Sequence, residues 1–128
     1  MDKTVKYSAA ETYQTKDGSL IRELMHPDQH GNRNQSLAEA EVGPGVTTLL
    51  HCHHQSEELY HITAGQGLMT LANDQFDVVT GDTVHIAPGV AHCIRSIGTN
   101  PLKILCCSSP PYSHEDTELL ESPSSSLS

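Results

Sequence analysis

The stretch HCHHQSEELYHITAG, residues 51–65, holds four histidines and two adjacent glutamates. The whole chain has 9 histidines in 128 residues. At that frequency one His-x-His pair is expected by chance roughly 0.6 times, so the pair alone is a weak signal. The spacing around it, and a partner element elsewhere in the chain, must therefore decide whether residues 51–65 form a site.

His51 and His53 can bind the same ion if they lie on a β-strand. Residues i and i+2 of a strand face the same side, roughly 7 Å apart, and two such imidazoles can bind one cation at about 2.0–2.1 Å each. Cys52 then faces away. A carboxylate at the start of the next strand and His92, which opens the strand after the Pro88-Gly89 turn, can complete the set. We predict a pocket of three imidazoles and one carboxylate inside a small barrel.

Turn-forming residues separate short runs rich in Val, Ile, Thr, Leu and Tyr along the whole chain. The turns are expected at residues 16–18, 43–45, 72–75, 81–82 and 98–101. This spacing is typical of an all-β sandwich or barrel. The length of 128 residues is that of one domain.

Two segments resemble the paired motifs of the cupins. The first motif is Gly, five residues, His-x-His, three or four residues, Glu, six residues, Gly. It reads here as Gly45, VTTLL, HCH at 51–53, HQSE, Glu58, LYHITA and Gly65, and every position fits. Glu57 also satisfies a three-residue gap after the histidines, but it leaves seven residues before Gly65, so Glu58 is preferred.

The second motif is Gly, five residues, Pro-x-Gly, two residues, His, three residues, Asn. It reads here as Gly81, DTVHI, APG at 87–89, VA, His92, CIR and Ser96. Ala87 stands in place of a proline and Ser96 in place of the asparagine. Neither position is a metal ligand in the motif, and two motifs in order are far more specific than a His-x-His pair.

The resemblance covers roughly residues 35–108 and implies a double-stranded β-helix, a jelly-roll barrel with one open mouth. It also implies that His51, His53, Glu58 and His92 bind a divalent transition metal. Three imidazoles and a carboxylate suit Mn, Fe, Co, Ni, Cu or Zn, and affinity does not choose between them.

The remaining segments are expected to pack around this barrel. Residues 1–34 are predicted to add strands and a polar loop at 25–34, and residues 109–121 a tail with a short helix that begins at Ser113. The tail PPYSHEDTE can cross the barrel mouth or cap the outside, and we favour the outside. Residues 122–128 are Ser-rich and predicted to be disordered.

A six-coordinate metal with four protein ligands keeps two positions open, which favours an enzyme over a structural site. We expect an oxygenase-type reaction on a small organic substrate. A sugar or uronate isomerase or epimerase and a non-catalytic small-molecule-binding cupin are the alternatives. Glu58 is a candidate general base, and Tyr60, on the same strand face, is either a substrate-orienting hydroxyl or a core residue.

The amino-acid composition limits the classes of binding partner that we expect. With 16 acidic and 7 basic residues, the net charge of −9 disfavours nucleic acid and anionic membrane surfaces. The N-terminal residues contain no apolar signal-peptide core, so we expect a cytoplasmic protein with four reduced cysteines. Exposed edge strands predict a homodimer. His54, His61 and His85 are expected to face away from the metal.

Overall fold

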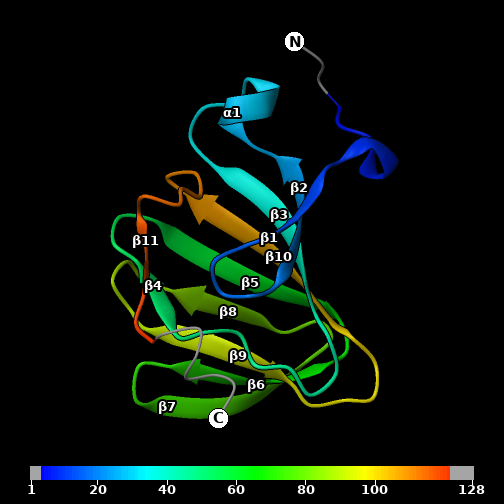
Figure 1. The fold of residues 1–128 in the computed structure, drawn as a ribbon, viewed down its shortest axis with the longest axis vertical. Helices are drawn as coiled ribbons and strands as arrows, with labels where there is room; N and C mark the ends of the chain where they lie inside the picture. Colours follow the sequence, from blue (N-terminus) through cyan, green and yellow to red (C-terminus); the bar gives the residue numbers. More distant parts are fainter. Residues whose placement is uncertain (1–3, 122–128) are drawn as a thin grey trace.

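The structure is a computed structural model that describes residues 4–121, and it consists of two packed antiparallel sheets (Figure 1). One sheet has the strand order β1-β2-β3-β10-β5-β8, and the other has the order β11-β4-β9-β6-β7. The elements are η1 (Tyr7–Ala9), β1 (Thr12–Gln14), β2 (Leu20–Met25), α1 (Pro27–His30), β3 (Ser36–Val42), β4 (His51–His53), β5 (Glu57–Ala64), β6 (Gln66–Leu71), β7 (Asp74–Val79), β8 (Thr83–Ile86), β9 (His92–Ser96), β10 (Leu102–Ser109) and β11 (Thr117–Leu119).

The predicted all-β double-stranded β-helix is confirmed. Strands far apart in sequence pair side by side: β10 lies between β3 and β5, and β9 lies between β4 and β6. This interleaving is what wraps one chain into a jelly roll rather than a meander. Both cupin-like motifs therefore contribute strands to both sheets.

Alternation along the strands places polar side chains at one end of the interior and apolar ones at the other. Residues of β3, β10 and β5 that face inward lie opposite one another in rows. The rows, from the polar end, are Ser36–Ser108–Glu58, Ala38–Cys106–Tyr60 and Ala40–Ile104–Ile62. The apolar end is tightly buried, with Ile62 and Leu102 at 0 % exposure. Burying such a side chain stabilises the fold by about 1.5–3 kcal/mol. The apolar end therefore offsets the cost of burying polar side chains at the other end.

The N-terminal residues extend the first sheet through β1 and β2. The predicted loop at 25–34 contains one helical turn, α1, because its ends carry strong helix signals. The side chain of His26 accepts a hydrogen bond from the Asp28 backbone N–H, Pro27 occupies the first position, and Gly31 ends the turn in the left-handed conformation.

The prediction of a short C-terminal helix from Ser113 is wrong. The chain turns at 114–116 and then forms β11, whose Thr117 and Leu119 pair with His53 and His51 of β4. An isolated helix of two turns is only marginally stable, whereas pairing with the exposed edge of β4 satisfies both backbones. The predicted disordered end, 122–128, lies outside the described residues.

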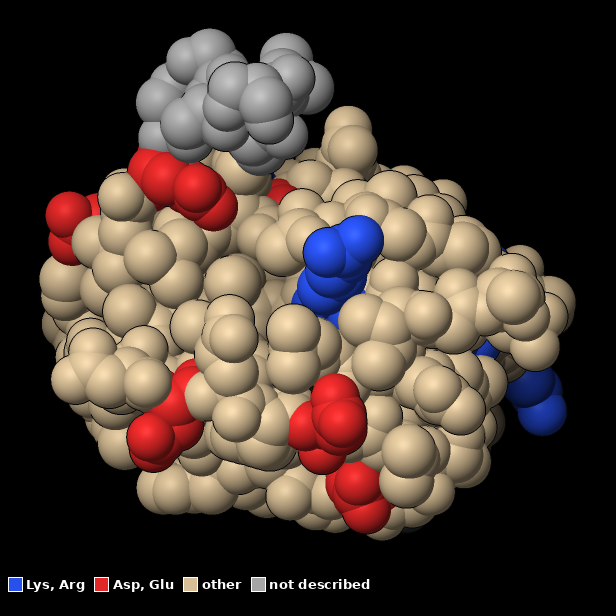
Figure 2. Space-filling view, turned by 90° about the horizontal axis from the view of Figure 1, so that it is seen from below, with Lys and Arg blue, Asp and Glu red and all other residues tan. Residues whose placement is uncertain are grey.

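Charged side chains are spread over the surface. On the face that Figure 2 shows, acidic side chains lie at the left edge and over the lower part, and one basic side chain stands near the centre. Within residues 4–121, none of the helices has the length and apolarity that a membrane span needs.

Gly65 and Gly81 allow a test of how closely the chain after β5 approaches the start of β10. Both have positive φ, +84° and +100°, but an added Cβ would lie 2.7 Å from the Pro101 carbonyl oxygen at Gly65 and would meet nothing within 4 Å at Gly81. We expect Gly81→Ala to cost about 1–2 kcal/mol for its backbone conformation alone. Gly65→Ala should cost about 1–3 kcal/mol more, because the Pro101 backbone must shift.

Urea unfolding followed by circular dichroism measures both variants. Equal losses in the free energy of unfolding would contradict the close approach at Gly65.

Candidate metal centre

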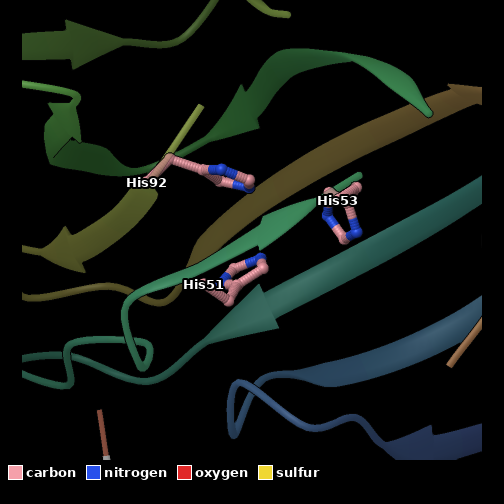
Figure 3. A group of neighbouring side chains, drawn as sticks. All are labelled: His51, His53 and His92. Carbon is pink, nitrogen blue, oxygen red and sulfur yellow. The ribbon is translucent and has the colours of Figure 1, made fainter. Parts of the chain in front are cut away.

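Three histidines converge inside the barrel from two neighbouring strands (Figure 3). His51 and His53 come from β4, and His92 of β9 is the direct cross-strand partner of His51. Their side chains are buried, at 3 %, 5 % and 0 % exposure. One ring nitrogen of each lies within 4.8 Å of the others, so the group could hold a metal ion.

The Nδ1 atom of each ring is engaged by a partner behind it. His51 Nδ1 lies 2.8 Å from the Leu49 carbonyl oxygen, and His92 Nδ1 lies 3.0 Å from that of Val90. A carbonyl only accepts, so both Nδ1 atoms carry the proton and both Nε2 atoms carry a lone pair.

Thr117 of β11 fixes the third ring. Its hydroxyl donates to the Ser113 carbonyl at 2.8 Å, and His53 Nδ1 lies 2.9 Å from the hydroxyl oxygen of Thr117. With its proton used, the hydroxyl accepts from His53 Nδ1–H, so the Nε2 atom of His53 also presents a lone pair to the interior. Partners of this kind orient ligand histidines in metal sites.

Glu58 completes the cluster from the opposite sheet. Its Oε1 atom lies 3.2 Å from His53 Nε2 and 3.6 Å from His92 Nε2, while Oε2 accepts a hydrogen bond from Ser108 at 3.2 Å. Glu57 points outward and pairs with His85 at 2.7 Å. Strand alternation thus places Glu58 beside the histidines and Glu57 on the surface.

A cation fits the centre of this cluster. His53 Nε2, His92 Nε2 and Glu58 Oε1 are buried and have no hydrogen-bond partner among the described residues. Burial raises the pKa of Glu58, but the adjacent imidazoles of His53 and His92 outweigh burial and lower the pKa to about 2, so the carboxyl is ionised. Buried lone pairs and a carboxylate at this distance are costly unless a proton or a metal ion lies between them.

His51, His53 and Glu58 line a cavity of about 50 Å³. Its lining includes Asp17, whose Oδ2 lies 3.7 Å from His51 Nε2 and whose Oδ1 accepts two hydrogen bonds from Ser19. Asp17 could not be predicted as a site residue from the motifs, since it lies in the turn between β1 and β2, outside both of them. Its backbone is tied to the site, because the Leu49 N–H donates to its carbonyl at 2.8 Å.

Two tyrosines form part of the cavity wall. Tyr60 is buried beside His92, with ring centroids 5.9 Å apart, and its orienting role stays a prediction. Tyr112, in the tail that was expected on the outside, packs edge-on against His53 at 5.9 Å and lines the cavity. The tail therefore reaches the mouth, because β11 draws residues 110–116 across it.

The other histidines predicted to face away do so. His54, His61 and His85 are exposed. His54 belongs to a second cluster on the outer face of the β4–β11 pair, where its Nε2 atom lies 2.8 Å from Glu118 and near the buried Cys52. This outer group also has metal-ligand chemistry, but two of its three members are exposed.

The match to a protein-family model decides the family. The model of the cupin domain matches residues 38–108. The chain belongs to the cupin family. Residues 4–37 and 109–121, which supply Asp17, Tyr112 and Thr117 to the site, lie outside the matched segment.

Several known proteins resemble this chain in sequence or in fold. An uncharacterised protein of Methanocaldococcus jannaschii is 59% identical over 116 residues, which cover 91% of this chain and 93% of the relative. Oxalate decarboxylase of Lactobacillus farciminis has a TM-score of 0.76 at 22% identity; the match covers 88% of this chain and 34% of that chain. The Streptomyces nucleoside dehydratase Pac13, in a variant with uridine, has a TM-score of 0.79 at 12% identity over 94% of this chain and 92% of that one.

The ligand set can be tested by metal content. We expect His53→Ala and His92→Ala each to lower bound metal after dialysis by at least tenfold, because each removes an inward-facing Nε2 atom. His61→Ala, on the outer face of β5, should retain the metal of the unmodified protein. Elemental analysis measures all three, and full occupancy in a His53, His92 double variant would contradict the site.

The pH dependence of stability follows from His51. Burial lowers the pKa of His51, and the nearby His92 acts in the same direction. The unfolded chain takes up a proton near pH 6.5 that the folded site resists, so the metal-free protein should lose stability as the pH falls below about 6.5. The ionised Glu58 adds a further loss only below about pH 4.5.

Chemical unfolding of the metal-free protein between pH 7.5 and 5 measures how the free energy of unfolding changes with pH, and the slope of that dependence tests the prediction. His51→Gln should flatten it, whereas His61→Ala should leave it unchanged. A slope that survives in His51→Gln would assign the effect to another group.

Proposed function

We propose that this cupin is a metal-dependent enzyme that performs an oxygenase-type reaction on a small organic substrate. The observation that carries the proposal is the set of buried, unpartnered atoms His53 Nε2, His92 Nε2 and Glu58 Oε1, since His53 and Glu58 line a cavity. A purely structural site has a closed ligand set, whereas this cluster borders free space.

His51, His53, His92 and Glu58 would hold the ion. A divalent transition metal bound there supplies Lewis acidity and, if it is redox-active, a centre for dioxygen chemistry. Tyr60 and Tyr112 wall off the histidines and exclude bulk water. Because a water molecule needs about 10–15 Å³ of such space, a cavity of about 50 Å³ admits only a few non-hydrogen atoms of a substrate.

Two proteins with a similar fold are enzymes, which favours catalysis over simple binding. The Lactobacillus farciminis protein is an oxalate decarboxylase and the Streptomyces protein is a nucleoside dehydratase. Their identity to this chain is low, so they support an enzyme without pointing to either reaction.

A proton-transfer reaction, such as isomerisation of a sugar or uronate, is the second candidate. Asp17 favours it, because this buried carboxyl lies 3.7 Å from His51 Nε2 and is held in place by Ser19. A proton-transfer enzyme needs such a group beside the metal in addition to Glu58. A non-catalytic small-molecule-binding cupin is the remaining alternative.

Reconstitution with iron(II) under anaerobic conditions tests the proposal. A panel of small organic compounds is then added with oxygen, and oxygen consumption and products are measured. We expect turnover that falls at least a hundredfold in Glu58→Gln, since this change removes a ligand and a candidate base. Glu57→Gln, one residue away on the surface, is the matched control and should keep full activity.

Conversion of a compound without oxygen consumption would replace the oxygenase proposal with the proton-transfer reaction. Stoichiometric binding of a compound that is never converted would establish the non-catalytic alternative.

A further inference from the structure

Glu23 is a buried carboxyl group that the metal site does not use. It lies on β2, outside the segment matched by the family model, and is only 5 % exposed. Its Oε2 atom accepts a hydrogen bond from the Tyr13 hydroxyl at 3.2 Å. Its Oε1 atom is buried and has no hydrogen-bond partner among the described residues. A buried acceptor left without a donor is costly, so this oxygen has the capacity to accept a hydrogen bond from a water molecule or a ligand.

Glu23 faces free space because its neighbours are small. It pairs with Ala38 of β3, and the row continues across the sheet through Cys106 to Tyr60. Both Ala38 and Cys106 line the cavity beside the histidines, as does Glu23. The carboxyl and the metal centre thus open into one cavity from different strands.

The same carboxyl also borders an outer groove. This groove, of about 600 Å³, lies between α1 and the tail at 111–115. Tyr13, Glu23 and Tyr112 line both spaces and therefore form the boundary between them. A molecule that extends from the groove into the metal cavity must pass the unpartnered oxygen of Glu23.

The walls of both spaces carry carboxyl groups and lack basic chains. Asp17, Glu58, Asp28 and Glu115 join Glu23, and no Lys or Arg is among the described residues that line either space. His26 adds no free donor, since its Nδ1 atom accepts from Asp28 N–H and its Nε2 atom lies 2.8 Å from the Tyr112 carbonyl. Gln29 and His114 also line the groove, but a second carboxylate or a phosphate placed beside Glu23 would face the repulsion of its carboxylate.

We propose that Glu23 binds the ligand of this cavity by accepting a hydrogen bond from a ligand hydroxyl or ammonium group. The site thereby selects neutral or cationic hydrogen-bond donors over anions at this point. The inference rests on the proposed function only in taking the metal cavity as the place where the ligand acts. Burial raises the pKa of Glu23, and a hydroxyl, which both donates and accepts, suits either form of the carboxyl.

Three probes of similar size test this selection: 2-aminoethanol, ethylene glycol and glycolate. Their affinities are measured by NMR titration at millimolar concentrations, with the zinc-loaded and with the metal-free protein. In Glu23→Gln the Tyr13 hydroxyl keeps the amide oxygen engaged, so the amide N–H₂ donor replaces the acceptor. We expect the affinity ratio of 2-aminoethanol to glycolate to fall about tenfold or more, with ethylene glycol in between.

Two further variants make the result decisive. Glu41→Gln, on the outer face of β3, is the matched control and should leave the ratio unchanged. Tyr13→Phe frees the second oxygen of Glu23 and should raise the ratio, so it keeps the test valid if Glu23→Gln unfolds. A ratio that stays within twofold in Glu23→Gln and Tyr13→Phe overturns the proposal.

The two forms of the protein separate this inference from the proposed function. Glu23 is not one of the proposed metal ligands, so the change in ratio is expected with and without zinc. A change in ratio in a protein that binds no zinc would reject the metal-dependent function and keep the role of Glu23. Zinc binding without any change in ratio would reject the role of Glu23 alone.

Discussion

The structure depends on one constraint: three buried imidazoles present lone pairs, not protons, to the same point. Carbonyl oxygens of Leu49 and Val90 and the Thr117 hydroxyl occupy the Nδ1 sides of the three rings. The Nε2 atoms of His53 and His92 then lie 3.2 and 3.6 Å from Oε1 of the ionised Glu58, where a proton or a metal ion would relieve the repulsion. Burial of apolar side chains at the other end of the interior offsets the cost of this arrangement. Ile62, Leu102 and Ile104 are almost completely buried there.

The segments outside the family motifs complete the centre. β11 seals the edge of β4 and supplies Thr117, and the tail before it places Tyr112 against His53. The turn before β2 brings Asp17 to His51, and β2 itself brings Glu23 to the cavity. The motifs thus supply the candidate metal ligands, whereas the flanking segments shape the cavity beside them and its charge.

The sequence predicted the barrel and the convergence of His51, His53 and His92, because period-two alternation and two spaced motifs report directly on strands and their inner faces. The same logic separated Glu58 from Glu57. It failed for residues 113–120, where a local helix signal at Ser113 was overridden by pairing with the edge of β4, a contact between residues 64 positions apart. Asp17, Glu23 and Tyr112 escaped prediction for the same reason: their roles arise from long-range packing and leave no pattern in the local sequence.

X-ray absorption at the zinc edge of the zinc-loaded protein tests the central claim most directly. Convergence of three Nε2 atoms and Glu58 predicts a first shell of imidazole nitrogen and carboxylate oxygen at about 2.0–2.2 Å, with no sulfur. The outer group of Cys52, His54 and Glu118 is the alternative in the described part of the chain. A sulfur scatterer at about 2.3 Å would place the ion there and contradict the account of an inward-facing metal centre.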